Sequence, residues 1–170
     1  MTSREQRPAL LTPMVEEVPA MEELMNPDER QAWRRFRSVN IRLLEHLDQE
    51  LQRRSRLSLT DFEILTVLAE STHQRARMSE VADRVMVSRS RLTYRIDRLE
   101  RLGLVRREEC QVDRRGLFAQ LTDEGLETIT TATPGHLADI RAWFMNSMDT
   151  DELTRMDAVM RRLDANLPSV

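Results

Sequence analysis

The stretch that decides the fold runs from Ser88 to Gly116 and reads SRSRLTYRIDRLERLGLVRREECQVDRRG. Ser88 is of a type that caps helices, and the apolar residues after it recur every three or four positions, at Leu92, Ile96, Leu99 and Leu102. This spacing predicts a helix with one face turned toward a core. The opposite face is predicted to expose Arg91, Tyr94, Arg95 and Arg98.

A hairpin is predicted directly after this helix. Gly103 can adopt the left-handed conformation that often ends a helix. The segments 104–110 and 117–121 are both strand-like, and the polar turn between them ends in Gly116. Arginines are therefore expected at the tip of a two-stranded hairpin.

A second helix is predicted just before Ser88. Ser79 is expected to cap a helix over Glu80–Val85, and the joint from Met86 to Ser88 is short. Two helices joined so tightly, the second one basic, form a helix-turn-helix pattern. With the hairpin, they predict a winged helix-turn-helix. The fold class is then mainly α with a small β-hairpin wing (α+β).

Further helices flank this lobe. Asn26 and Pro27 predict the start of a long helix that reaches about Arg54. The tetrapeptide 60–63, Thr-Asp-Phe-Glu, has capping-box spacing and predicts the start of a short helix, followed by a polar loop over 71–77. Thr122 is expected to cap a helix that kinks at Pro134 and Gly135, and residues 149–152 to open a final helix.

Three regions follow from these elements. Residues 1–26 are predicted to be an N-terminal arm, either packed on a partner subunit or a disordered leader. Residues 57–121 are predicted to form the winged helix-turn-helix lobe. Residues 27–56 and 122–168 are predicted to form a helical dimerisation region, because the first helix is longer than one compact lobe needs.

Charge is distributed unevenly along the 170 residues. The formal net charge is -3, and all 26 basic residues are arginine. The segment 75–116 alone contains twelve Arg and seven Asp or Glu, a balance of +5, which leaves -8 for the remainder. Phosphate binding depends on local positive charge, so this asymmetry favours a nucleic-acid surface on an acidic body.

Other functional classes have little support in the sequence. The single cysteine, Cys110, excludes an intramolecular disulfide and a thiolate metal cluster, and the three histidines lack ligands at metal-binding spacing. We expect no metal or other cofactor. Phosphate-binding loops and nucleophile motifs are also missing, so an enzyme is not expected. No apolar run approaches the roughly 20 residues of a membrane span, and a cytosolic location is expected.

The order of elements and several motifs resemble the MarR family of bacterial transcriptional regulators, from about Pro27 to Leu167. The resemblance rests on residues 78–82, 88–93, 99–105, 113–115 and 121–125. It implies a homodimer, expected to be a repressor, that binds a palindromic operator in double-stranded DNA and is released by a small aromatic or phenolic effector. The family's effector cleft would lie near Arg42, His46 and His136. The alternative is a winged-helix module that binds proteins and has no DNA specificity.

Individual roles follow if the helix capped by Ser88 enters the major groove. Ser90, Arg91 and Tyr94 are then expected to read base edges, and Arg89, Thr93 and Arg95 to contact phosphates. By resemblance, Arg115 is the wing arginine that enters the minor groove. Arg114 is predicted either to contact phosphate or to be solvated, and Asp113 to shape the turn.

Overall fold

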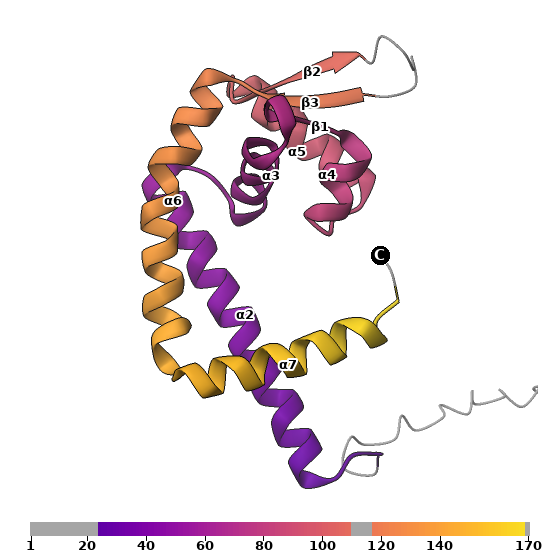
Figure 1. Ribbon diagram of the computed structural model, residues 1–170, viewed down its shortest axis with the longest axis vertical. Helices are drawn as coiled ribbons and strands as arrows, with labels where there is room; N and C mark the ends of the chain where they lie inside the picture. The colour runs from indigo at the N-terminus through magenta and orange to yellow at the C-terminus, as the bar shows by residue number, and fades with distance from the viewer. Residues whose placement is uncertain (1–23, 110–116, 169–170) are drawn as a thin grey trace, which may run out of the picture. The chain divides into compact units, whose positions relative to one another are not determined.

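The computed structural model describes residues 24–109 and 117–168. Its elements, drawn in Figure 1, divide into two units at Val39 and Asn40, and each unit is considered by itself. In chain order the helices and strands are α2 (Pro27–Ser55), α3 (Leu59–Glu70), β1 (Arg75–Arg77), α4 (Met78–Arg84), α5 (Arg89–Arg101), β2 (Val105–Glu109), β3 (Leu117–Leu121), α6 (Asp123–Trp143) and α7 (Thr150–Asn166).

The start of α2 confirms the predicted cap. The side-chain oxygen of Asn26 accepts a hydrogen bond from the Glu29 amide at 3.0 Å, and the Glu29 carboxylate accepts one from the Asn26 amide at 2.9 Å. Within the first turns of α2, the rings of Trp33 and Phe36 stack with centroids 6.0 Å apart. Both rings remain about half exposed, at 49% and 45%. This aromatic pair is therefore available to a partner surface.

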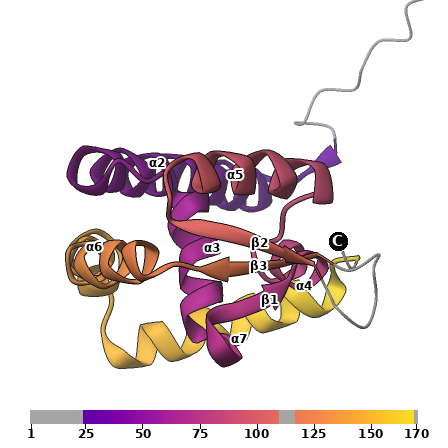
Figure 2. The ribbon, with the colours of Figure 1, turned by 90° about the horizontal axis from the view of Figure 1, so that it is seen from above.

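In the second unit, α3, α4 and α5 pack with a three-stranded antiparallel sheet of order β1-β3-β2, seen from above in Figure 2. The strands β2 and β3 are the predicted hairpin. Strand β1 was not predicted, because residues 71–77 were expected to be a polar loop. Only Ala76 of its three residues is buried, opposite Ala119, so the segment is too short to show an alternating pattern. Its strand conformation depends on hydrogen bonds to β3.

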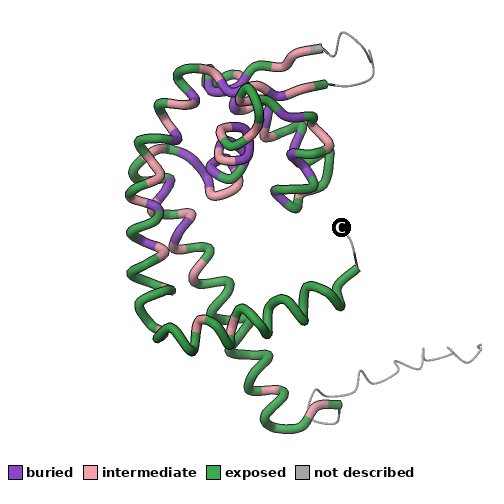
Figure 3. Tube along the Cα trace, viewed as in Figure 1, coloured by how far each residue is buried: buried purple, intermediate pink, exposed green. Residues whose placement is uncertain are grey.

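The core of the lobe confirms the predicted apolar stripe of α5, with one exception. Leu92, Ile96 and Leu99 are at most 1% exposed, and Figure 3 shows the buried residues gathered in this lobe. Leu102 is the exception at 47% exposed, because it stands at the helix C-cap, where the chain turns away. Gly103 follows with φ of 75°, the left-handed conformation that was expected.

Two predicted helix starts are wrong in position. The cap of α3 is Ser58, which forms a capping box with Asp61, whereas Thr60 lies inside the helix. Helix α4 begins at Met78, one residue before the predicted cap Ser79, and no side chain caps it. In both cases the start is set by packing. Leu57, directly before the α3 cap, is 1% exposed, and strand β1 leads straight into α4.

The terminal helices follow the prediction more closely. The Thr122 side chain accepts a hydrogen bond from the Gly125 amide, and α6 continues through Pro134 to Trp143. Asp149 and Glu152 form the predicted capping box at the start of α7. Every residue of α7 is at least partly exposed, and most are in the exposed class, as its green colour in Figure 3 shows. Helix α7 therefore has an uncovered apolar face.

Candidate nucleic-acid interface

The turn between α4 and α5 places the start of α5 at the surface. The amide of Val87 donates to the carbonyl oxygen of Ala82 at 3.0 Å, which closes the turn. The side chain of Ser88 then caps α5 by accepting from the Arg91 amide at 3.3 Å, and its oxygen lies 3.2 Å from that of Ser90. The predicted cap is confirmed, and it fixes the first turn of α5.

Five predicted contact residues lie together on the exposed face of this first half of α5: Arg89, Ser90, Arg91, Thr93 and Tyr94. Tyr94 is 63% exposed. The Thr93 hydroxyl donates to the carbonyl oxygen of Arg89 at 2.9 Å. Its oxygen still has lone pairs but no second proton, so Thr93 must give up this bond before it can donate to a phosphate.

Arg95 was expected to contact phosphate, but its guanidinium points into the lobe. It donates to the Ser58 hydroxyl at 3.1 Å and lies 3.6 Å from the carboxylate of Asp61. Arg98 forms an ion pair with the same carboxylate, and it also donates to the carbonyl oxygen of Arg56 at 3.3 Å. Asp61 itself is 0% exposed. Two arginines of α5 therefore hold one buried carboxylate of α3.

The buried carboxylate was missed in the sequence analysis. The spacing from Thr60 to Glu63 predicted a capping box with Asp61 inside it, and this pattern indicates no ion-pair partner for Asp61. The available signal was the alternative spacing Ser58-x-x-Asp61, followed by α5 arginines one turn apart. A buried carboxylate needs charged or hydrogen-bonding partners, and those arginines supply them.

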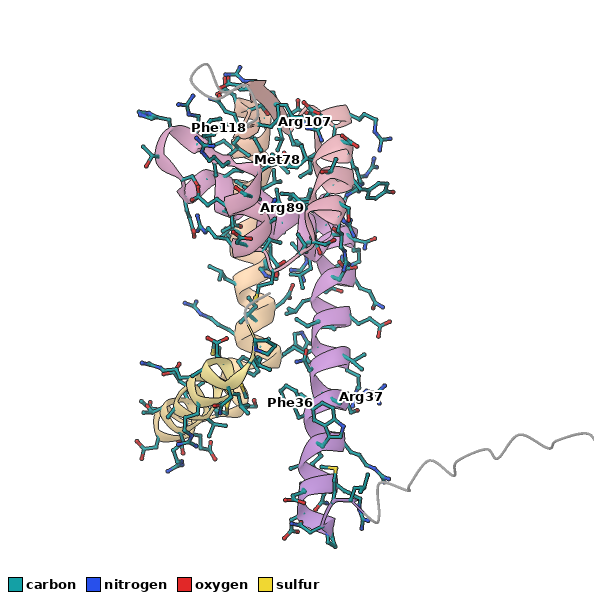
Figure 4. The ribbon with its side chains drawn as sticks, turned by 90° about the vertical axis from the view of Figure 1, so that its right-hand side faces the viewer. Phe36, Arg37, Met78, Arg89, Arg107 and Phe118 are labelled. Atoms are coloured by element: carbon teal, nitrogen blue, oxygen red, sulfur yellow. The ribbon has the colours of Figure 1, made fainter. Side chains whose placement is uncertain are left out.

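Arginines also surround the sheet. Arg107 of β2 forms ion pairs with Asp97 and Glu100 of α5, both at 2.6 Å. On the other side, the guanidinium groups of Arg75 and Arg77 lie 5.0 and 5.3 Å from the centroid of the Phe118 ring. Figure 4 labels Phe118 and Arg107 on this lobe. The predicted wing-tip residues Asp113, Arg114 and Arg115, together with Cys110, lie outside the described residues.

Of the three predicted effector residues, His136 lines one of the two cavities described below, and Arg42 and His46 line neither. The imidazole of His46 packs edge-on against Trp143 with centroids 4.7 Å apart, and that of His136 lies 4.5 Å from the Phe62 ring. Arg42 is exposed on α2. His46 Nε2 and His136 Nδ1 are buried without a hydrogen-bond partner among the described residues.

His136 has the more strongly perturbed surroundings. Burial lowers the pKa of its imidazole, and the nearby Asp139 carboxylate opposes this effect. A cavity of about 10 Å³ beside it is lined by Glu50, Leu51, Arg54, Ser55, Ala132, His136 and Asp139. That volume is close to what one water molecule requires. The site is thus a tight polar junction between α2 and α6.

A larger groove, of about 460 Å³, lies nearby and includes none of the three predicted effector residues. Its lining is Arg54, Ser55, Glu124, Glu127, Thr128, Thr131, Ala132 and Gly135. Among the described residues, no three His, Cys, Asp or Glu side chains gather as a metal site would require. Within the same ranges, every helix is too short or too polar to cross a membrane.

Known proteins are similar to this chain in both sequence and fold. A sequence model of the MarR family matches residues 57–116. The regulator PecS of Dickeya dadantii is 33% identical over 113 residues, which cover 66% of this chain and 68% of PecS. The match to the family model includes the helix-turn-helix and the capped start of α5.

Solved structures agree. AbsC, a MarR family transcriptional regulator of Streptomyces coelicolor, is 41% identical with a TM-score of 0.80, over 83% of this chain and 95% of AbsC. Sco3205 of the same organism, a MarR family regulator solved in complex with DNA, is 36% identical with a TM-score of 0.83, over 85% and 91% of the two chains. By sequence and by fold, this chain belongs to the MarR family of transcriptional regulators.

Proposed function

We propose that the protein is a homodimeric repressor that binds a palindromic operator through α5 and the wing. The observation that carries this proposal is the exposed face at the start of α5, where arginine, serine and tyrosine side chains stand on a capped, ordered helix turn. The DNA complex of Sco3205, whose sequence is 36% identical, supports the same ligand for this chain.

Within the proposed interface, the two arginines at the start of α5 have different tasks. Arg91 is the third residue of α5 and can pair in bidentate fashion with a guanine edge. Arg89, the first residue of the helix, is placed for phosphate contact. The proposed DNA-binding set is Ser88, Arg89, Ser90, Arg91, Thr93 and Tyr94, with Arg114 and Arg115 on the wing and Asp113 shaping its turn.

A second copy of the chain is the proposed partner of the terminal helices. Three apolar side chains of α7 and the one at its C-cap are 40% to 67% exposed, namely Val159, Met160, Leu163 and Leu167, and Trp143 at the end of α6 is 61% exposed. Exposed apolar surface of this extent favours burial against another subunit. We therefore assign residues 27–56 and 122–168 to the dimerisation region, 57–121 to the DNA-binding lobe and 1–26 to an arm.

The proposed regulation is release by a small aromatic or phenolic effector. The imidazoles of His46 and His136 each lie beside an aromatic ring, on α2 and α6, and these ring pairs support the proposal that the two helices bind such a ligand. By linkage, operator DNA must weaken effector binding by the same factor by which the effector weakens operator binding. Titration of salicylate with and without operator tests this reciprocity, and equal affinity in both titrations would exclude salicylate as the regulator.

Sequence-specific DNA binding is tested in two steps. Bound sites are first selected from genomic fragments, and Arg91→Ala is then compared with Arg101→Ala. Both residues are exposed arginines on α5, but Arg101 is at the far end of the helix. We expect Arg91→Ala to reduce the preference for operator over random duplex about tenfold or more. Arg101→Ala should leave that preference unchanged. Failure of the wild type to select any sequence, or binding that does not weaken steeply with salt, would favour the protein-interaction alternative.

A further inference from the structure

Arg107 joins the wing to the recognition helix at four points. Its backbone amide donates to Glu100 Oε1 at 2.9 Å, and its Nη1 donates to Glu100 Oε2 at 2.6 Å. Its Nη2 lies 2.6 Å from Asp97 Oδ1 and donates to the carbonyl oxygen of Thr93 at 3.3 Å. A single side chain of β2 therefore binds three residues that span two turns of α5.

Strand β2 directs the Arg107 side chain to the face of the sheet that packs on the helices. Along β2, Val105 is buried at 2%, Arg106 is exposed and Arg107 is partly buried. Because side chains alternate along a strand, Arg107 lies on the same face as Val105, toward the helices. Its partner across the ladder is Ala119, which is 0% exposed. An arginine is thus directed inward at a position that a core residue would ordinarily occupy.

Helix α5 supplies the hydrogen-bond acceptors for Arg107 on one side of the helix. Asp97 and Glu100 are three residues apart, so their carboxylates lie on the same side of α5, and the Thr93 carbonyl lies one turn before Asp97. Charge-assisted bonds from one planar guanidinium restrict both position and angle. The side chain of Arg107 is 24% exposed, so water competes only in part for these bonds.

We propose that Arg107 is a positioning residue that sets the distance and angle between the recognition helix and the wing. This inference rests on the proposed function, because it assumes that α5 enters the major groove while the wing enters the adjacent minor groove. The two contacts can form together only if helix and wing keep a fixed spacing. Arg107 is the middle residue of β2, so its bonds to α5 fix the direction of this strand relative to the helix.

A second consequence concerns charge. Asp97 is half exposed on the helix that faces phosphates, where an uncompensated carboxylate would repel DNA. The guanidinium of Arg107, which Asp97 shares with Glu100, offsets part of this charge without occupying the exposed face around Arg89, which lies toward the other end of the lobe in Figure 4. Arg107 therefore acts through the placement of other groups and does not itself need to touch DNA.

The test compares Arg107→Gln with Arg106→Gln. Both variants remove one positive charge from β2, but Arg106 is 61% exposed and pairs with Glu108 of its own strand. Each variant is measured on the selected operator, on an operator changed at its major-groove positions, and on one changed in the flanking minor-groove positions. We expect Arg107→Gln to lose most discrimination at the flanks, roughly tenfold, and to keep discrimination at the central positions. Arg106→Gln should keep both.

Two further variants separate positioning from folding. Arg107→Lys retains the charge but cannot bind two carboxylates and a carbonyl with one fork, so it should fold and still lose flank discrimination. The exchange of Arg107→Glu with Glu100→Arg should restore part of that discrimination. Equal behaviour of Arg107→Lys and wild type at the flanks, or equal losses for Arg107→Gln and Arg106→Gln, would overturn the proposal. Failure of the wild type to discriminate at any position would instead refute the proposed function.

Discussion

The guanidinium of Arg54 in α2 lies against the backbone of Gly135 in α6. Arg54 Nη1 donates to the Gly135 carbonyl oxygen at 3.2 Å, and the same atom lies 3.1 Å from the place that a Cβ on residue 135 would occupy. The guanidinium also holds Asp139 through two bonds, at 2.7 and 3.0 Å. Pro134, the residue before Gly135, has no amide to donate within α6, so Arg54 binds this helix directly after an interruption of its backbone hydrogen bonds.

The first prediction concerns this pair. Gly135→Ala should stabilise an Arg54→Ala background by about 1 kcal/mol, the helix propensity difference between alanine and glycine. In the wild type the gain should be smaller or absent, because the added methyl group must displace the guanidinium. Urea unfolding of the four proteins in a double-mutant cycle measures the coupling. An equal gain in both backgrounds would show that the Arg54 side chain moves aside with no loss in the free energy of unfolding.

The second prediction concerns pH and His136. Burial holds the pKa of this imidazole below its usual 6.5, so the folded protein releases the proton more readily than the unfolded chain. Stability from this residue is therefore fully present above about pH 6.5. It declines as the pH falls toward the folded pKa, by about 1.4 kcal/mol for each unit of difference.

Urea unfolding at several pH values and a constant protein concentration checks this dependence. His136→Gln should flatten the decline between pH 7.5 and 5.5, because the glutamine does not titrate. His73→Gln, at an exposed position, serves as the control and should retain the wild-type decline. If both variants decline as the wild type does, then acid destabilisation comes from other groups.

The third prediction concerns the buried carboxylate. Asp61→Asn should destabilise the protein by about 2 to 3 kcal/mol, since Arg95 and Arg98 would lose the charge they share. The matched control is Glu70→Gln on the same helix. Glu70 pairs with Arg84 at 2.8 Å, but its side chain is 60% exposed, so the expected loss is within about 0.5 kcal/mol. Similar losses of stability for the two variants would mean that the buried ion pairs of Asp61 stabilise the protein no more than the exposed pair of Glu70.

The fourth prediction concerns the turn before α5. Met86 has φ of 54°, a conformation that is strained for any residue with a Cβ, and its side chain is 75% exposed. Met86→Gly should stabilise the protein by about 1 kcal/mol, because the strain disappears and little packing is lost. Met86→Ala keeps the Cβ and should change stability very little. Thermal unfolding of both variants distinguishes strain from packing, since a purely packing role would make both destabilising.

The sequence by itself determined the local elements. The capping residues Asn26, Ser88, Thr122 and Asp149 all occupy their predicted positions, because a cap depends on residues within one turn. The apolar spacing of α5 and the left-handed Gly103 are local in the same sense. Family membership followed from these same short motifs.

Only the tertiary structure decided how charged side chains pair between elements. Arg95 and Arg107 both belong to the basic stretch and look equivalent in sequence, yet one is held by Asp61 of α3 and the other by Asp97 and Glu100 of α5. Strand β1 and the α3 cap likewise depend on neighbours supplied by distant residues. An arginine has the same charge in any setting, and its partner is determined by which backbone segments the packed core brings within reach.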